Sequence, residues 1–130
     1  MYTPAFPALC QPLRLRGITL SNRMAAAPMG YPELTAEGPL TQDAIAFYEL
    51  RAKGGAALIT VGEAVVHYAT GRSHGRSINL SHPDVLAGLT QLARAIRRHG
   101  AAASIELAHG GKFSAVDSLP GGRRRGAARC

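Results

Sequence analysis

The chain has 130 residues, the length of one ordinary domain, and its 46% hydrophobic residues are sufficient for a packed core. Its formal charge of +7 is concentrated near the C-terminus, because residues 1–119 carry only 11 basic against 8 acidic side chains. These features exclude a wholly disordered protein and argue against a specific nucleic-acid-binding domain; they favour a mildly basic globular body with a solvated basic tail.

The first predicted element is a hairpin. Apolar and polar residues alternate over residues 13–20, and Gly17 stands at the break between the two halves. Residues 24–29 follow as a run of small apolar residues, which is typical of a buried strand.

A helix and a second strand are predicted after a loop rich in glycine and proline. Thr41 has the side chain of an N-cap, and Gly54 with Gly55 supplies the helix end. The apolar residues between them fall on one side of a helix: Ala44, Ile45, Phe47, Tyr48 and Ala52. Residues 56–61 are apolar, partly β-branched and bounded by glycines, so they predict a second buried strand.

A long polar loop through residues 71–76 is expected to lead into a second helix. Ser81 and Asp84 have the spacing of a capping box, and apolar residues then recur at helical spacing until Gly100 marks the end. Residues 101–107 predict a third strand.

The alternation of strands and helices predicts parallel β/α units joined by right-handed crossovers. A doubly wound sheet and an α/β barrel both satisfy this pattern, but a barrel takes about 250 residues, so a chain of this length has room only for part of one. In either fold the chemistry lies in the loops after the strands, here residues 29–31, 62–63 and 109–112.

Three groups of residues form motifs in a fixed order between residues 9 and 114. They are Leu9-x-x-Pro12 with Leu20-x-Asn22-Arg23-Met24 and Ala27-Pro28-Met29 at the first strand, Tyr48-x-x-Arg51-Ala52-x-Gly54-Gly55 before the second, and Ile105-x-Leu107-x-His109-x-Gly111-Lys112 at the third. Together they resemble the N-terminal part of the old yellow enzyme family, the FMN-dependent NADH:flavin oxidoreductases that include 2,4-dienoyl-CoA reductases and 2-enoate reductases.

The resemblance implies an α/β fold: the first three β/α units of a TIM (β/α)8 barrel, preceded by the hairpin. Residues 1–114 would be the barrel part and residues 115–130 a disordered basic tail. It also implies FMN bound at the C-terminal face, NAD(P)H as hydride donor, and a small-molecule substrate of enone or enoyl type. By resemblance, the cofactor-binding residues are Pro28, Met29, Gly30, Glu63 and Glu106. The catalytic residues stay unassigned, because the resembled family places its substrate-orienting pair later in the barrel.

Two of these positions depart from the family pattern. Gly30 stands where the family often has threonine or cysteine, so no side chain can tune the flavin there. Glu106 stands where glutamine is common, and an ionised carboxylate accepts hydrogen bonds but donates none. If Glu106 is buried, we expect it to pair with Arg23 or Lys112. Glu63 would add a second carboxylate near the same ring.

No metal site, membrane segment or disulfide framework is predicted. The histidines show no zinc-like spacing to one another or to Cys10 and Cys130, and we expect His109 to belong to the scaffold. No apolar run approaches the roughly 20 residues that cross a bilayer, and the start is a poor secretory signal. We therefore expect a cytoplasmic protein.

The family pattern dissolves after residue 114 into a tail of Gly, Arg and Ala, which suggests a truncation or a shifted reading frame. Two functions remain open. The first is an FMN-dependent oxidoreductase represented by its N-terminal piece, which by itself would bind FMN weakly and turn nothing over. The second is a non-catalytic fragment that binds polyanions weakly through the arginine-rich tail.

Overall fold

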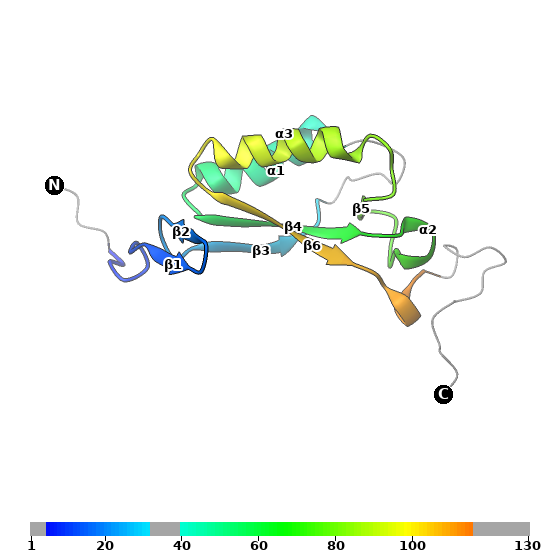
Figure 1. The fold of residues 1–130 in the computed structure, drawn as a ribbon, viewed down its shortest axis with the longest axis horizontal. Helices are drawn as coiled ribbons and strands as arrows, with labels where there is room; N and C mark the ends of the chain where they lie inside the picture. The colour runs from blue at the N-terminus through cyan, green and yellow to red at the C-terminus, as the bar shows by residue number, and fades with distance from the viewer. Residues whose placement is uncertain (1–4, 32–39, 116–130) are drawn as a thin grey trace.

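The structure is a computed structural model that describes residues 5–31 and 40–115 (Figure 1). Of the predicted tail at residues 115–130, residues 116–130 lie outside the described residues. The described chain begins with the expected hairpin, in which β1 (Leu13–Leu15) runs antiparallel to β2 (Ile18–Leu20).

A parallel sheet follows, as the alternating pattern predicts. Its strands are β3 (Ala25–Met29), β4 (Leu58–Val65), β5 (Ile78–Asn79) and β6 (Ala102–Ala108). β4 is central: Val61 pairs with both Met29 and Ile105, so β3 and β6 lie on opposite edges of β4. The short β5 joins the edge that β3 occupies, beyond the point where β3 ends.

Two long helices, α1 (Gln42–Lys53) and α3 (Val85–Arg97), cover one face of this sheet (Figure 1). α1 begins where predicted, because the Thr41 hydroxyl accepts a hydrogen bond from the Ala44 amide at 3.2 Å. α3 ends at Arg97, and the turn that follows it contains Gly100, whose φ of +79° is the left-handed conformation that favours glycine. Each helix returns the chain to the start of the next parallel strand.

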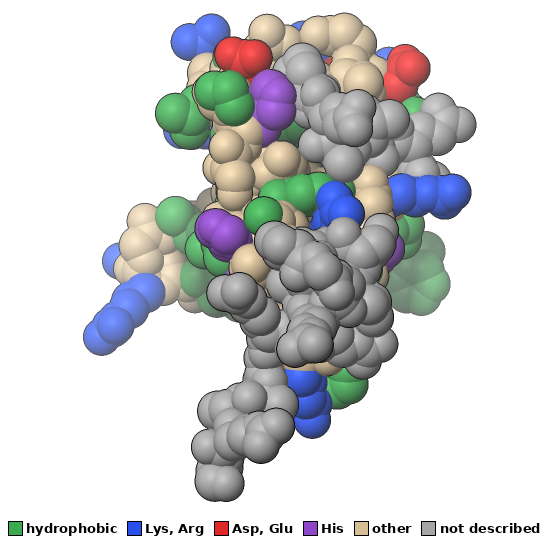
Figure 2. All heavy atoms as spheres, turned by 90° about the vertical axis from the view of Figure 1, so that its right-hand side faces the viewer, with side chains coloured by type: hydrophobic (Ala, Val, Ile, Leu, Met, Phe, Trp, Pro, Cys, Tyr) green, Lys and Arg blue, Asp and Glu red, His purple; other side chains and the backbone are tan. Residues whose placement is uncertain are grey.

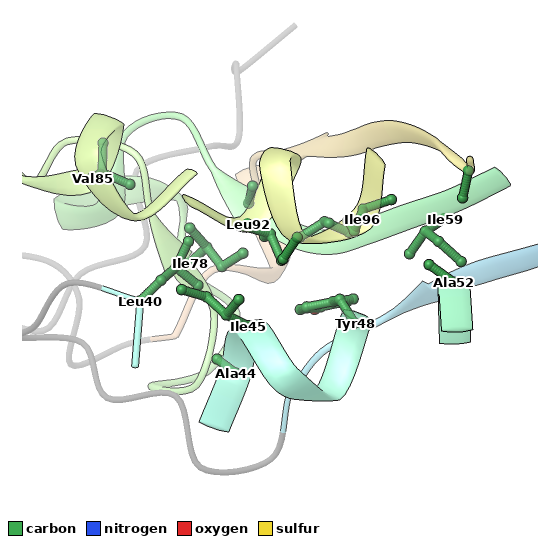
Figure 3. Close-up of a cluster of buried hydrophobic side chains, with 14 residues drawn as sticks. Leu40, Ala44, Ile45, Tyr48, Ala52, Ile59, Ile78, Val85, Leu92 and Ile96 are labelled. Atoms are coloured by element: carbon green, nitrogen blue, oxygen red, sulfur yellow. The ribbon is translucent and has the colours of Figure 1, made fainter. Parts of the chain in front are cut away.

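The core lies between the helices and the sheet face that they cover (Figure 3). Figure 3 shows Tyr48 of α1 lying below Leu92 and Ile96 of α3, with Ala52 of α1 beside Ile59 of β4. Ile59 and Ile96 are fully buried, and burial of such a side chain contributes about 1.5–3 kcal/mol. The core therefore fixes α1, α3 and β4 against one another.

The structure corrects three details of the sequence prediction. β4 continues to Val65 instead of ending at Val61, because pairing with β5 and β6 carries it through an irregularity at residues 62–63. The polar loop contains the one-turn helix α2 (Tyr68–Gly71) as well as β5. The Ser81 hydroxyl does not cap α3, since it accepts a hydrogen bond from the Tyr68 amide at 3.2 Å instead.

The first strand is less buried than predicted, and the third strand is exposed in the same way. Most residues of β3 and β6 are exposed, whereas β4 is largely buried. The reason is that the helices cover one face only, and that within residues 5–31 and 40–115 each of β3 and β6 has a partner strand on one side.

Candidate functional site

The carboxyl ends of β3, β4 and β6 meet at one edge of the sheet, as they must in a parallel arrangement. Figure 2 looks onto this side of the molecule, where histidine and Lys or Arg side chains are spread over the surface and the acidic side chains in view lie toward the helix layer. The 3-10 turn η1 (Gly111–Phe113) follows β6 here.

Three residues from three strands converge at this edge: Pro28, Gly62 and Glu106. A Cβ atom placed on Gly62 would lie 2.6 Å from the Pro28 Cβ and 2.8 Å from the Glu106 Oε2. Both distances are shorter than van der Waals contact, so only glycine fits between these side chains as they stand. The structure thus brings two of the predicted site residues together, and it adds Gly62, which the sequence analysis placed in a site loop but not among the cofactor-binding residues.

Met29 and Gly30 continue this surface. Met29 is 55% exposed although it is a large apolar side chain. A Cβ on Gly30 would meet nothing within 4 Å among the described residues, so open space surrounds this position. An exposed apolar side chain beside an open glycine leaves room for a planar ring over the strand end.

The Glu63 carboxylate, which we expected near the cofactor ring, has other partners in the structure. Glu63 lies within β4, and its carboxylate accepts a hydrogen bond from Ser73 Oγ at 3.0 Å and lies 3.1 Å from His74 Nε2. The Arg76 amide holds the His74 ring by donating to its Nδ1 at 3.1 Å. The Glu63 side chain therefore holds the loop after α2 against the strand.

Glu106 is exposed, so the condition under which we expected it to pair is not met. Neither Arg23 nor Lys112 forms an ion pair with it within the described part of the chain; the Lys112 ammonium lies 4.9 Å from the centre of the Phe113 ring. Its carboxylate faces the position beside Gly62 and Pro28. Glu106 can act there as a hydrogen-bond acceptor.

Tyr48 of α1 contacts the carboxyl-terminal part of β3 and β4 from the face of the sheet that the helices cover. Its hydroxyl lies 2.8 Å from the carbonyl oxygen of Met29 and 2.9 Å from that of Gly62, and it donates to them. Burial raises the pKa of this phenol above its ordinary value of 10.0, so it stays protonated at neutral pH. The sequence prediction placed Tyr48 on the apolar side of a helix and missed this contact; the available signal is that a buried tyrosine needs a partner for its hydroxyl.

Arg51 contacts the same strand end, one turn after Phe47. Its guanidinium carbon lies 3.5 Å from the centre of the Phe47 ring, and Nη2 lies 3.7 Å from the Met29 sulfur. Phe47 in turn contacts the ring of Tyr31, with the centroids 5.3 Å apart. α1 therefore holds residues 29–31 through side chains on adjacent turns.

His109 joins two loops of the same edge. Its Nδ1 accepts a hydrogen bond from the Gly111 amide at 3.1 Å, and its Nε2 lies 3.3 Å from the Thr70 hydroxyl. A Cβ on Gly71 would lie 2.5 Å from the histidine ring, so glycine is needed for this packing. These contacts agree with the expected scaffold position.

No group of three or more His, Cys, Asp or Glu side chains that could hold a metal ion occurs among residues 5–31 and 40–115. No helix in these ranges is long and apolar enough to cross a membrane.

Comparison with known proteins places the chain in a family. The family model described as NADH:flavin oxidoreductase / NADH oxidase matches residues 8–129. The NADPH dehydrogenase of Geobacillus sp. (strain WCH70) is 36% identical over 110 residues, which cover 84% of this chain and 32% of that protein. The NADH:acrylate oxidoreductase of Vibrio harveyi is 33% identical over 98 residues, covering 75% of this chain and 10% of that protein. The chain thus spans about a third of the length of the first of these relatives and a smaller share of the second.

Solved structures show the same fold. Morphinone reductase in complex with tetrahydroNAD superposes with a TM-score of 0.76 at 25% identity, covering 90% of this chain and 31% of that one. Old Yellow Enzyme from Pichia sp. AKU4542 gives 0.77 at 17% identity, covering 87% of this chain and 30% of that one. These neighbours are TIM barrels, so the described elements are the hairpin and first units of such a barrel, the third unit being represented by its strand β6. The family uses FMN with NADH or NADPH as the hydride donor. The chain belongs to the NADH:flavin oxidoreductase / NADH oxidase family.

Proposed function

We propose that this chain supplies the first FMN-facing strand ends of an oxidoreductase that moves hydride from NAD(P)H to an activated alkene of enone or enoyl type. The observation that carries the proposal is the convergence of Pro28, Gly62 and Glu106 at the carboxyl edge of the sheet. In a TIM barrel this edge is the face that carries the active site.

The residues at this edge fit the ring system of FMN. Pro28 and Met29 offer an apolar surface, Gly30 leaves space above it, and Glu106 presents an exposed carboxylate to accept an N–H hydrogen bond. Glu63 would contribute its main chain, because its carboxylate is engaged by Ser73 and His74. FMN, when bound, supplies the hydride chemistry, and these residues supply binding and orientation.

Glu106 gives the proposed site an unusual charge. A carboxylate beside the ring opposes any further negative charge there and repels a ring carbonyl oxygen, whereas an amide side chain could donate to that oxygen. The proposal therefore includes an FMN site that is weaker than one with glutamine at this position.

We also propose that residues 1–114 form the barrel part and residues 115–130 a separate basic tail. On this view the 130-residue chain alone binds FMN weakly and shows no NADPH-dependent turnover. The described edge supplies residues from three strands only, and a complete site would draw on further β/α units.

A chimaera tests the proposal. Residues 1–115 are joined to the part of the Geobacillus NADPH dehydrogenase that follows its matched 110 residues. We expect a yellow protein that retains FMN and oxidises NADPH when an enone is added. A chimaera that folds by circular dichroism but retains no FMN would reject the proposal and leave the non-catalytic alternative.

Two glycine variants of the chimaera serve as a matched pair. A Cβ would meet nothing within 4 Å at either Gly30 or Gly17, so neither position resists a larger side chain sterically within the described residues. Gly30→Leu is expected to abolish FMN retention by filling the space over the strand end, whereas Gly17→Leu, in the hairpin, is expected to retain it. Equal FMN content in the two variants would show that the ring does not lie at Gly30.

A further inference from the structure

We propose that Tyr48 is a positioning residue, which fixes the ends of β3 and β4 at the separation and orientation that the cofactor ring requires. The inference rests on the proposed function for the identity of the ligand, but not for the contacts themselves. Tyr48 lies on α1, on the covered face of the sheet, so it acts through the strand ends and does not itself touch the ring.

The contact joins two strands at the point where the regular ladder is interrupted. β3 ends at Met29, and the pairing of β4 with β6 skips from Val61 to Ala64, so residues 62–63 form an irregularity. A carbonyl that leaves a ladder inside a protein needs another partner. The Tyr48 hydroxyl provides it for Gly62 at 2.9 Å and at the same time binds the Met29 carbonyl at 2.8 Å.

One proton serves both carbonyl oxygens, since a phenol carries a single donor. The two distances differ by no more than 0.1 Å, which describes a shared, three-centre hydrogen bond. The position of the Tyr48 oxygen is set in turn by its ring, which is 1% exposed and packed edge-on against Phe47 at 5.1 Å. A rigid side chain thus dictates where the two carbonyls lie.

The orientation of these carbonyls also decides where the next amides point. A peptide unit is planar and trans, so its N–H is directed opposite to its C=O. The Met29 carbonyl shares its unit with the Gly30 amide, and the Gly62 carbonyl shares its unit with the Glu63 amide. Because both carbonyls face the phenol, both N–H groups are directed away from it, as donors for a ligand at the strand ends.

Tyr48→Phe in the 130-residue chain tests the inference, because it removes the hydroxyl and keeps the ring. Ile96→Val is the matched control: it loses one methyl group from the same core, and Ile96 lies on α3. Urea unfolding measures the stability of both variants. Amide NMR shifts of Gly30 and Glu63 report the strand ends without any ligand, and FMN titration followed by fluorescence quenching reports binding.

We expect Tyr48→Phe to shift the Gly30 and Glu63 amide resonances and to weaken FMN binding by about tenfold, which corresponds to roughly 1.4 kcal/mol. Ile96→Val is expected to lower the urea midpoint comparably, with neither effect. Identical amide shifts and FMN affinities in the two variants would overturn the inference.

The design separates this inference from the proposed function. If the unsubstituted chain binds no FMN, the ligand assignment fails for the isolated chain, while the amide shifts still decide whether Tyr48 fixes the strand ends. If Tyr48→Phe does not fold, the unsubstituted protein decides: a proton held between two carbonyls exchanges slowly and gives its own hydroxyl resonance. Rapid exchange of that proton with water would refute the positioning role.

Discussion

Replacing Gly62 with alanine probes the convergence of the three strand ends directly. Gly62 is not among the described glycines with positive φ, so its backbone accepts alanine and the cost is steric. The new Cβ would lie 2.6 Å from the Pro28 Cβ and 3.2 Å from the Pro28 Cα. The second atom belongs to the backbone, so a side-chain rotation cannot relieve the clash and β3 must move away from β4.

The size of the effect follows from two opposing contributions. Overpacking in a close-packed region lowers the free energy of unfolding by about 1–3 kcal/mol. The lower entropy of the unfolded chain with alanine offsets about 0.4–1 kcal/mol of this loss. We therefore expect Gly62→Ala to destabilise the protein by about 1–2 kcal/mol, or roughly 5–10 °C in Tm for a domain of this size.

Thermal unfolding followed by circular dichroism measures this change, and FMN titration of the same samples measures its effect on the site. Gly30→Ala is the control, because a Cβ there meets nothing within 4 Å and Tm should stay within about 2 °C of the parent. A Gly62→Ala protein as stable as the parent would refute the close approach of Pro28 and Glu106 to this glycine.

The remaining predictions concern two carboxylates. Hydrogen bonds from Arg98 and His99 lower the pKa of Glu49 below its ordinary value of 4.5. This contact therefore stabilises the fold above about pH 4.5 and is lost as the pH falls through the folded-state pKa. Glu49→Gln should remove this part of the acid sensitivity, seen as a smaller difference between urea midpoints at neutral and acidic pH; an unchanged difference would contradict it. Glu106→Gln should tighten FMN binding about fivefold by replacing a repelling carboxylate with a donor worth about 1 kcal/mol. Equal FMN affinity in titrations of the two proteins would dismiss the effect of the charge.

Local signals in the sequence were sufficient to predict the order and type of the main helices and strands. Thr41 caps α1 through its own hydroxyl, and Gly100 adopts the left-handed conformation in the turn after α3. Both effects depend on a few neighbouring residues, so the sequence predicts them well. The hairpin at residues 13–20 was predictable for the same reason.

Details that depend on long-range pairing were not predictable in this way. β4 passes through Gly62 and Glu63 because β6, far away in the sequence, pairs with it on both sides of the irregularity, and β5 pairs with it beyond the irregularity. Ser81 has the spacing of a capping residue, yet its hydroxyl is used by the Tyr68 amide, which only the folded chain brings near. A local motif cannot show which of two partners a hydroxyl will select.

The same distinction between local sequence signals and long-range packing applies to the candidate site. Pro28, Met29 and Glu106 could be named from the sequence, because motifs at strand ends indicate which segments face the carboxyl edge of a parallel sheet. The tertiary structure decided that Gly62 lies between Pro28 and Glu106, that the Glu63 carboxylate turns to Ser73 and His74, and that Tyr48 joins two strand ends. The physical reason is that packing across the sheet sets the distances between strands and the hydrogen-bond partners of buried groups. The sequence by itself specifies only the order of those groups along the chain.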